Sequence, residues 1–220
     1  MTLEEFSFEF DVMYNNITSN QAPGLSELEK SVFLTQAQEL LVKQYYKGDL
    51  EQSFENTEET TQYLNSLVSQ AVYGIDDMIS GKGVLLNSNL KSSFFQMPEE
   101  AMFITYEAAK LNCTNGKDAL VVPTTQDEFY NVHRNPFRGP SRNRVVRLIN
   151  NGIIELYSTS QVNKYLVRYI KYPDPIVLPG SDGVKPFSDY PQGLNTKLPE
   201  SLHRNILMQA VALAKATWAS

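Results

Sequence analysis

The most distinctive chemistry in the sequence is a run of arginines within residues 134–147, with no acidic residue between Glu128 and Glu155. A guanidinium group can hold a carboxylate in a two-bonded pair or attract a phosphate by charge. The segment therefore predicts a contact with carboxylates of a neighbouring chain, or a DNA contact that reads no sequence. We favour the protein contact because the other half of the chain is acidic. The candidate subunit-interface or channel-lining residues are Arg134, Arg138, Arg142, Arg144 and Arg147.

Charge is divided unevenly along the chain. Residues 1–128 contain 20 acidic and 7 basic side chains, a net charge of −13, whereas residues 129–220 contain 5 acidic and 12 basic ones, a net charge of +7. The two parts could pair within one molecule, or they could meet between neighbouring molecules. The sequence leaves both alternatives open.

Residue types that serve in catalysis are present without the patterns that bring them together. The sequence contains no G-x-S-x-G, Walker, G-x-G-x-x-G or H-E-x-x-H motif, and Gly81-Lys82-Gly83 predicts only a flexible turn. The acids of Asp76-Asp77 and of Glu99-Glu100 are adjacent, so their side chains point apart. No motif ties His133 or His203 to a serine or cysteine nucleophile. We therefore expect no catalytic residue and no enzyme activity.

Cofactor, metal and membrane sites are not expected either. Cys113 is the single cysteine, which excludes a disulfide within the chain, and with two histidines it supplies too few ligands for zinc. A carboxylate metal site stays open, and we expect no cofactor. No apolar run approaches the roughly 20 residues of a membrane-spanning helix. Residues 1–11 carry four acids and no base, unlike a signal peptide, so a cytosolic start at or near Met1 is expected.

Helices are predicted at the N-terminal side of the chain. Thr2 with Glu5 and Ser26 with Glu29 match the S/T-x-x-E capping box, in which each side chain bonds to the backbone N–H of the other residue. These boxes predict helices from about residue 3 to 16 and from 27 to 47. Asn56 as a cap and an apolar stripe at helical spacing predict a third helix over residues 57–73.

Residues 83–178 show short apolar runs rich in aromatic and β-branched residues, which predict an antiparallel sheet or a small sandwich. Asn150-Asn151-Gly152 predicts a tight hairpin turn. A capping box from Thr125 to Glu128 predicts a short helix through Phe129 to Val132. The predicted strands contain Val84–Leu86, Phe94–Phe95, Met102–Ile104, Leu120–Val122, Val145–Ile149, Ile153–Tyr157 and Tyr165–Tyr172.

These elements together predict an α+β fold, in which a bundle of three N-terminal helices and a C-terminal helix carries an inserted antiparallel β-rich domain. Residues 173–198 hold five of the 11 prolines and are expected to form an extended arm that packs on another subunit or stays mobile. Pro199-Glu200 then predicts the start of the last helix. The predicted boundaries are 1–80, 81–172, 173–198 and 199–220.

Five distinctive stretches are spread over nearly the whole chain: Glu9–Leu25, Glu29–Thr35, Asn135–Arg138, Val167–Ile176 and Leu198–His203. Together they resemble structural proteins of crAss-like Bacteroides phages. The resemblance implies a homo-oligomeric ring, a dodecamer, in the head–tail connector or tail barrel of a short-tailed phage, assembled in the host cytoplasm. The implied partners are the portal protein, neighbouring tail ring proteins and DNA in the lumen, with a role as a conduit for DNA and cargo.

A ring role agrees with the composition. A ring closes when one contact between two different faces repeats around an axis, and oppositely charged halves offer such faces. The 12 tyrosines, 11 phenylalanines and one tryptophan exceed what a small core requires, and aromatic residues are enriched at interfaces. The alternative function is a soluble nucleic-acid-binding module that uses the arginines of residues 134–147.

Overall fold

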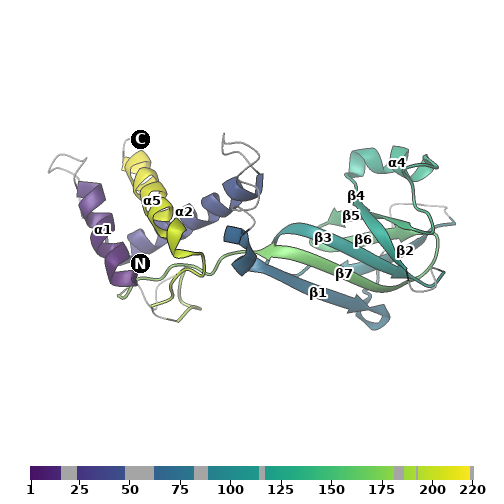
Figure 1. Cartoon of the computed structure of the whole chain (residues 1–220), viewed down its shortest axis with the longest axis horizontal. Coiled ribbons are helices and arrows are strands. Elements are labelled where there is room, and N and C mark those ends of the chain that lie inside the picture. The colour runs from purple at the N-terminus through teal and green to yellow at the C-terminus, as the bar shows by residue number, and fades with distance from the viewer. Residues whose placement is uncertain are drawn as a thin grey trace. The chain divides into compact units, whose positions relative to one another are not determined.

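The computed structural model describes residues 1–15, 24–47, 62–81, 89–113, 117–180, 186–191 and 193–218, with a mixed α/β content (Figure 1). The chain divides into two compact units, and the first contains both ends of the chain. It comprises Met1–Leu67 and Tyr172–Ser220, and the second comprises Val68–Lys171. By sequence, the first unit has a net charge of −9 and the second +3.

Among the described residues of the first unit, α5 packs against both α1 and α2. The apolar residues of α1 recur every four positions, so Phe6, Phe10 and Tyr14 share one buried face. The bounds are α1 Leu3–Asn15, α2 Glu27–Lys47, α5 His203–Trp218, and two short 3-10 turns, η1 Asn65–Leu67 and η3 Glu200–Leu202.

Both N-terminal capping boxes predicted from the sequence are confirmed. The Thr2 N–H donates to Glu5 Oε2 at 2.8 Å, and the Glu5 N–H donates to Thr2 Oγ1 at 3.2 Å. The Ser26 N–H and the Glu29 side chain are paired in the same way, at 2.8 Å, and this backbone hydrogen bond helps to lower the pKa of the Glu29 carboxyl. The first two helices therefore begin where the sequence predicts.

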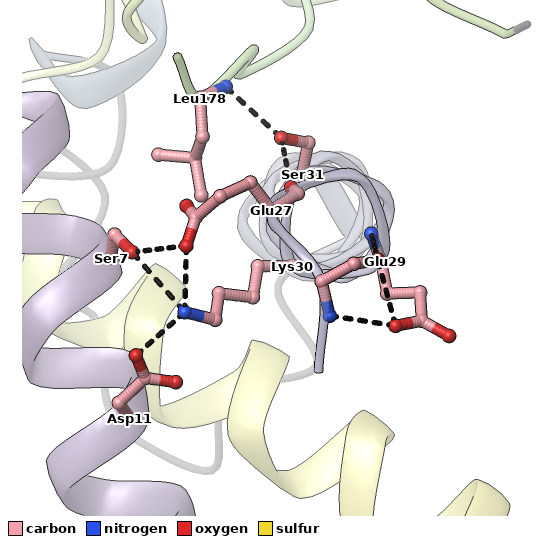
Figure 2. Close-up of polar contacts among 8 residues, drawn as sticks. Ser7, Asp11, Glu27, Glu29, Lys30, Ser31 and Leu178 are labelled. Carbon is pink, nitrogen blue, oxygen red and sulfur yellow. Dashed lines mark hydrogen bonds and ion pairs between the residues drawn. The ribbon is translucent and has the colours of Figure 1, made fainter. Parts of the chain in front are cut away.

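A buried lysine joins α1 to α2 (Figure 2). Lys30 on α2 donates to Asp11 of α1 at 2.6 Å, to Glu27 at 2.9 Å and to Ser7 at 3.2 Å. Burial acts to lower the pKa of Lys30, but hydrogen bonds and attraction from Asp11 and Glu27 outweigh it, so the pKa is raised. The ammonium is thus fully satisfied although its side chain is only 3% exposed.

Residues 174–178, part of the predicted arm, pack on α2 of the same chain. Ser31 accepts the N–H of Leu178 at 3.0 Å, Thr35 accepts that of Ile176 at 3.1 Å, and Gln38 donates to the carbonyl of Asp174 at 2.9 Å. Ile176, Val177 and Leu178 are buried. Residues 174–178 therefore pack on their own chain, and the prediction that the arm packs on another subunit or stays mobile remains a prediction for the rest of it.

Residues 174–178 pack on α2 because a row of polar side chains lies along one face of this helix. Ser31, Thr35 and Gln38 follow each other by three or four positions, so they lie in a row along the helix. A proline-broken segment cannot obtain its hydrogen bonds from a central strand, and this row supplies them instead. Farther along the predicted arm, Phe187 and Leu198 are also buried, while residues 181–185 and 192 lie outside the described part of the chain.

The second unit is a seven-stranded sheet with the order β1-β7-β3-β4-β5-β6-β2. The pair β4–β5 is parallel and the other pairs are antiparallel, so the prediction of a wholly antiparallel β region is wrong at this pair. The hairpin predicted at residues 150–152 is confirmed, with positive φ at Asn151 and Gly152. The strands are β1 Val68–Gly74, β2 Lys91–Gln96, β3 Ala101–Leu111, β4 Asp118–Pro123, β5 Arg144–Asn150, β6 Ile153–Ser158 and β7 Val162–Lys171.

The predicted third helix, residues 57–73, is wrong from Val68 onward. Residues 62–64 are helical, but Val68 begins strand β1, which pairs with β7 from Val68 opposite Ile170 to Gly74 opposite Lys164. Valine and tyrosine are favourable residues in a strand. The partner strand β7 lies nearly 100 residues away, so the sequence around Val68 does not indicate the pairing. The first unit consequently ends at Leu67 instead of residue 80.

The other predicted apolar runs that lie in described residues fall within strands β2 to β7, except that Tyr172 lies just beyond β7. The run Val84–Leu86 and the cap Asn56 lie outside the described residues. The core of the sheet includes a group of aromatic rings: Tyr73 of β1 lies 5.4 Å from Phe95 of β2 and 5.9 Å from Tyr165 of β7, measured between ring centres. The edge strands β1 and β2 thus approach each other, because the sheet curls around these rings.

Candidate interface surface

The helix predicted near residue 129 is confirmed as α4, Gln126–Arg134, which lies in the connection between the parallel strands β4 and β5 (Figure 1). Its buried Phe129 contacts Tyr157 of β6, with ring centres 4.6 Å apart. Thr125 stands at the predicted cap position, but its side chain makes no capping hydrogen bond. Packing of Phe129 therefore fixes α4 on the sheet.

A tight turn after α4 presents a side chain to solvent. The Asn135 Oδ1 atom accepts the backbone N–H groups of Phe137 at 2.9 Å and Arg138 at 3.2 Å. The Gly139 N–H donates to the Asn135 carbonyl at 2.7 Å, and a Cβ on Gly139 would lie only 2.7 Å from the same oxygen. Phe137, held at the top of this turn, is 84% exposed.

Three of the five candidate arginines are exposed around this turn. Arg134 ends α4, and its guanidinium carbon lies 4.3 Å from the centre of the Tyr130 ring, in cation–π contact. Arg138 follows Phe137 directly. Arg142 lies in the next turn, which is closed by a backbone hydrogen bond of 2.9 Å from Ser141 to Arg144.

The other two arginines act within the chain. Arg144 is half-buried and donates to the carbonyl of Phe137, which supports the turn from below. Arg147 pairs with Glu107 of β3, with N–O distances of 2.9 and 3.0 Å, and Tyr165 donates to the other oxygen of that carboxylate. Burial and the Glu107 charge raise the pKa of Tyr165. Arg147 therefore lies in a satisfied network inside the sheet, apart from the exposed arginines.

A hollow of about 280 Å³ lies between β4, α4 and the turn. Because one side is lined by β4 and the other by Phe137, an apolar group entering it would lose contact with water on both sides. The main lining residues are apolar Leu120, Val122, Val132 and Phe137 and charged Glu128, Arg138 and Arg144.

An apolar row continues from this hollow across the sheet. Val72, Leu166, Ala108 and Leu120 are cross-strand partners on β1, β7, β3 and β4, so they share one face. Val72 is 57% exposed and Leu120 is 59% exposed. An exposed aromatic, an apolar row and exposed arginines are features of protein–protein interfaces.

Comparison with known proteins shows the family of the chain. The whole chain, residues 1–220, matches the family described as phage tail ring protein 3/4. The chain belongs to this family. Ring protein 3 of Bacteroides phage crAss001 is 40% identical over 232 residues, covering 97% of this chain and 95% of that protein. Ring protein 4/5 of the same phage is 33% identical over 236 residues, covering 99% and 94%.

Membership of the ring protein family confirms the resemblance predicted from the sequence and gives the chain a structural role in a phage virion. Among the described residues of this ring protein, no group of three or more histidine, cysteine or acidic side chains could hold a metal ion. None of the described helices is both long and apolar enough to cross a membrane.

The sequence analysis named the arginines of this ring protein as candidates but did not name Phe137 or Asn135, which the structure places beside them. A signal was present, because Phe137 stands between Pro136 and Gly139 in a segment without helical or strand periodicity. An aromatic residue in such a segment has no element to bury it. Asn followed by Pro also favours a turn of the kind observed.

Proposed function

We propose that this ring protein forms a closed homo-oligomeric ring in the portal-proximal connector or tail barrel of a short-tailed phage, as part of the conduit for DNA and cargo. Membership of the ring protein family supports the ring. The observation that carries the lateral contact is the exposed Phe137 between exposed arginines, because large aromatic and guanidinium side chains supply most of the binding energy at many interfaces. A ring of twelve, bound to the portal and neighbouring ring proteins and assembled in the host cytoplasm, belongs to the same proposal.

The arginine surface, which we define as Arg134, Arg138, Arg142 and the supporting Arg144, binds carboxylates of the next subunit in this proposal. The net charges of the two units, −9 and +3, favour a contact of the first unit of one copy with the second unit of another. Arg147 is left out of the surface because Glu107 of its own chain already occupies its guanidinium.

The test is the double variant Arg138→Ala with Arg142→Ala. Its matched control is Lys91→Ala with Lys117→Ala, which removes two exposed positive charges elsewhere in the second unit. Mass photometry of protein co-expressed with its portal and neighbouring rings should show weaker assembly for the arginine variant alone, by roughly 2–5 kcal/mol per truncated buried pair. A protein that stays monomeric in all these mixtures would contradict the ring proposal.

The second candidate function, DNA contact through the same arginines, predicts a different outcome. Phosphate binding would make DNA retention fall steeply with salt. The double arginine variant would then assemble normally and alter DNA retention or ejection. Normal assembly with normal DNA handling would instead mean that the arginine surface is only solvated.

We also propose that the two units are separate domains, with the sheet inserted into the helical domain. The first and last strands of the sheet support this, because Val68 at the start of β1 pairs with Ile170 near the end of β7. The chain therefore enters and leaves the sheet at neighbouring positions. A fragment of residues 68–171 should fold alone, and a fragment without cooperative unfolding by circular dichroism would contradict the proposal.

A further inference from the structure

Helix α1 has a second apolar stripe that its own unit does not bury. Phe8 is 69% exposed and Val12 is 43% exposed, one helical turn apart and on the side opposite the buried stripe of Phe6 and Phe10. Glu4 lies one turn before Phe8 and is exposed. The outer face of α1 is thus acidic at its start and apolar in its middle.

The apolar row and the arginine surface offer the complementary pattern. The row from Val72 to Leu120 runs over four adjacent strands, a span of roughly 15 Å, and leads to the hollow beside Phe137 and Arg138. A helix of 13 residues is about 20 Å long. Helix α1 is therefore long enough to cover the apolar row while its acidic N-terminal end lies at the arginine surface.

Charge favours α1 over the exposed apolar sites on the other two long helices described in the first unit, α2 and α5. Met208 of α5 is 57% exposed, but Arg204 lies one turn before it. Tyr46 at the end of α2 is 40% exposed and is followed by Lys47. Both sites would bring like charge to the arginine surface, which disfavours binding, whereas Glu4 and Glu5 of α1 bring the opposite charge.

We infer that α1 of one copy binds the sheet unit of a neighbouring copy, with Phe8 in the hollow beside Phe137, Val12 on the apolar row, and Glu4 facing Arg138. This inference rests on the proposed ring function and names the surface that meets the arginines. The contact joins two different faces, so each copy gives one helix and receives one, and repetition around an axis closes a ring.

Covalent trapping tests the contact in the assembled protein. In a Cys113→Ser background, which removes the single cysteine, one chain carries both Glu9→Cys and Pro136→Cys, which lie next to Phe8 and Phe137 and leave both aromatic side chains in place. After assembly with portal and neighbouring rings, a short bis-maleimide linker should join copies into a ladder of multimers on a denaturing gel. Each single-cysteine chain is the control and should give no ladder.

The outcomes separate this inference from the proposed function. Rings that form without a ladder, or with only cross-linked monomer, overturn the α1 contact and leave the ring proposal standing. A protein that forms no ring with any partner overturns both. A ladder that stops at dimers also contradicts the inference, since a repeated contact must extend beyond two copies.

Charge exchange is the second test, because it does not depend on cysteine geometry. Glu4→Arg or Arg138→Glu alone should weaken ring formation roughly tenfold or more, and the two together should restore most of it. Phe8→Ser should weaken assembly similarly while Met208→Ser, the matched exposed control, should not. Equal effects of both serine variants, or no recovery in the exchanged pair, would overturn the inference.

Discussion

The hydroxyl of Tyr73 on β1 donates a hydrogen bond of 2.8 Å to the main-chain oxygen of Gln96 on β2, and these two strands stand at opposite ends of the strand order. A second bond, 3.0 Å from the Ile79 N–H to the Phe94 carbonyl, joins the segment that follows β1 to β2. Edge strands present unpaired backbone groups that can recruit other chains. The curled sheet reduces this risk by bringing its two edges together.

Replacing Tyr73 tests how much this bridge contributes. Tyr73→Phe keeps the aromatic ring but removes the donor, so the free energy of unfolding should fall by about 0.5–1.5 kcal/mol. Tyr73→Ala should cost more, because the contacts with Phe95 and Tyr165 are lost as well. Urea unfolding measures both. Tyr106→Phe is the control, with a side chain that is 53% exposed, and an equal loss there would contradict the bridge.

Lys30 gives a second stability prediction, this time for the first unit. Lys30→Ala leaves a cavity and removes the partner of Asp11 and Glu27, so it should cost about 1–3 kcal/mol. Lys30→Met fills much of the space with no charge and should cost less, because buried ion pairs are often replaceable by apolar groups. Lys43→Ala, which removes a surface pair at 3.7 Å, should change stability little. Thermal unfolding that ranks Met below Ala would contradict this account.

His203 makes the first unit sensitive to mild acid. The ring is buried, its Nε2 atom lies 3.1 Å from the Leu198 carbonyl, and its Nδ1 atom lies 2.9 Å from the Met1 ammonium. An ammonium can only donate, so Nδ1 accepts and the imidazole is neutral. Burial lowers the pKa of His203, with the hydrogen bond to Leu198 opposing and the Met1 charge adding to the decrease.

The sign of the pH effect follows from this lowered pKa. The unfolded chain binds the proton at about pH 6.5 and the folded chain only at lower pH, so the stabilising contribution is complete above pH 6.5 and is lost as pH falls toward the folded pKa. The free energy of unfolding should therefore fall between pH 7.5 and 5.5, at no more than about 1.4 kcal/mol per pH unit. His203→Gln should flatten that slope. An unchanged slope in the variant would assign the effect to other groups.

The turn that exposes Phe137 can be altered without touching Phe137 or an arginine. Asn135→Ala removes the side-chain oxygen that accepts two backbone N–H groups, whereas Asn135→Asp keeps an oxygen that can accept them. Assembly should weaken in the alanine variant and persist in the aspartate variant. Gly139→Ala should also weaken assembly, because its methyl group collides with the Asn135 carbonyl. Mass photometry gives the comparison, and full assembly of Asn135→Ala would show that turn geometry is unimportant.

Local chemistry explains which elements could be predicted from the sequence. The helices after Thr2 and Ser26 and the turn at Asn151 depend on neighbours within four residues, and all were predictable. Strand β1 was not, because its identity depends on pairing with β7. The parallel pair β4–β5 was missed for a similar reason, since alternating apolar residues do not reveal strand direction.

In the candidate site, too, features set by the local sequence were predictable and features set by distant residues were not. Charge alone located the arginines, but it could not separate Arg138, which faces solvent, from Arg147, whose partner Glu107 lies 40 positions earlier. The packing of residues 174–178 on α2 was also hidden, because the hydrogen-bonding row of Ser31, Thr35 and Gln38 becomes visible only once the chain returns to it.

The parallel pairing of β4 and β5 has a consequence for how such a surface can change during evolution. Antiparallel neighbours can be joined by two residues, but parallel neighbours require a dozen or more, and here residues 124–143 fill that requirement. The segment cannot be deleted without losing the parallel pair. Phe129 and Val132 pack on the sheet, but exposed positions such as Phe137, Arg138 and Arg142 do not. Related rings could therefore diversify their neighbour specificity by insertion and substitution in this crossover while inheriting the same scaffold.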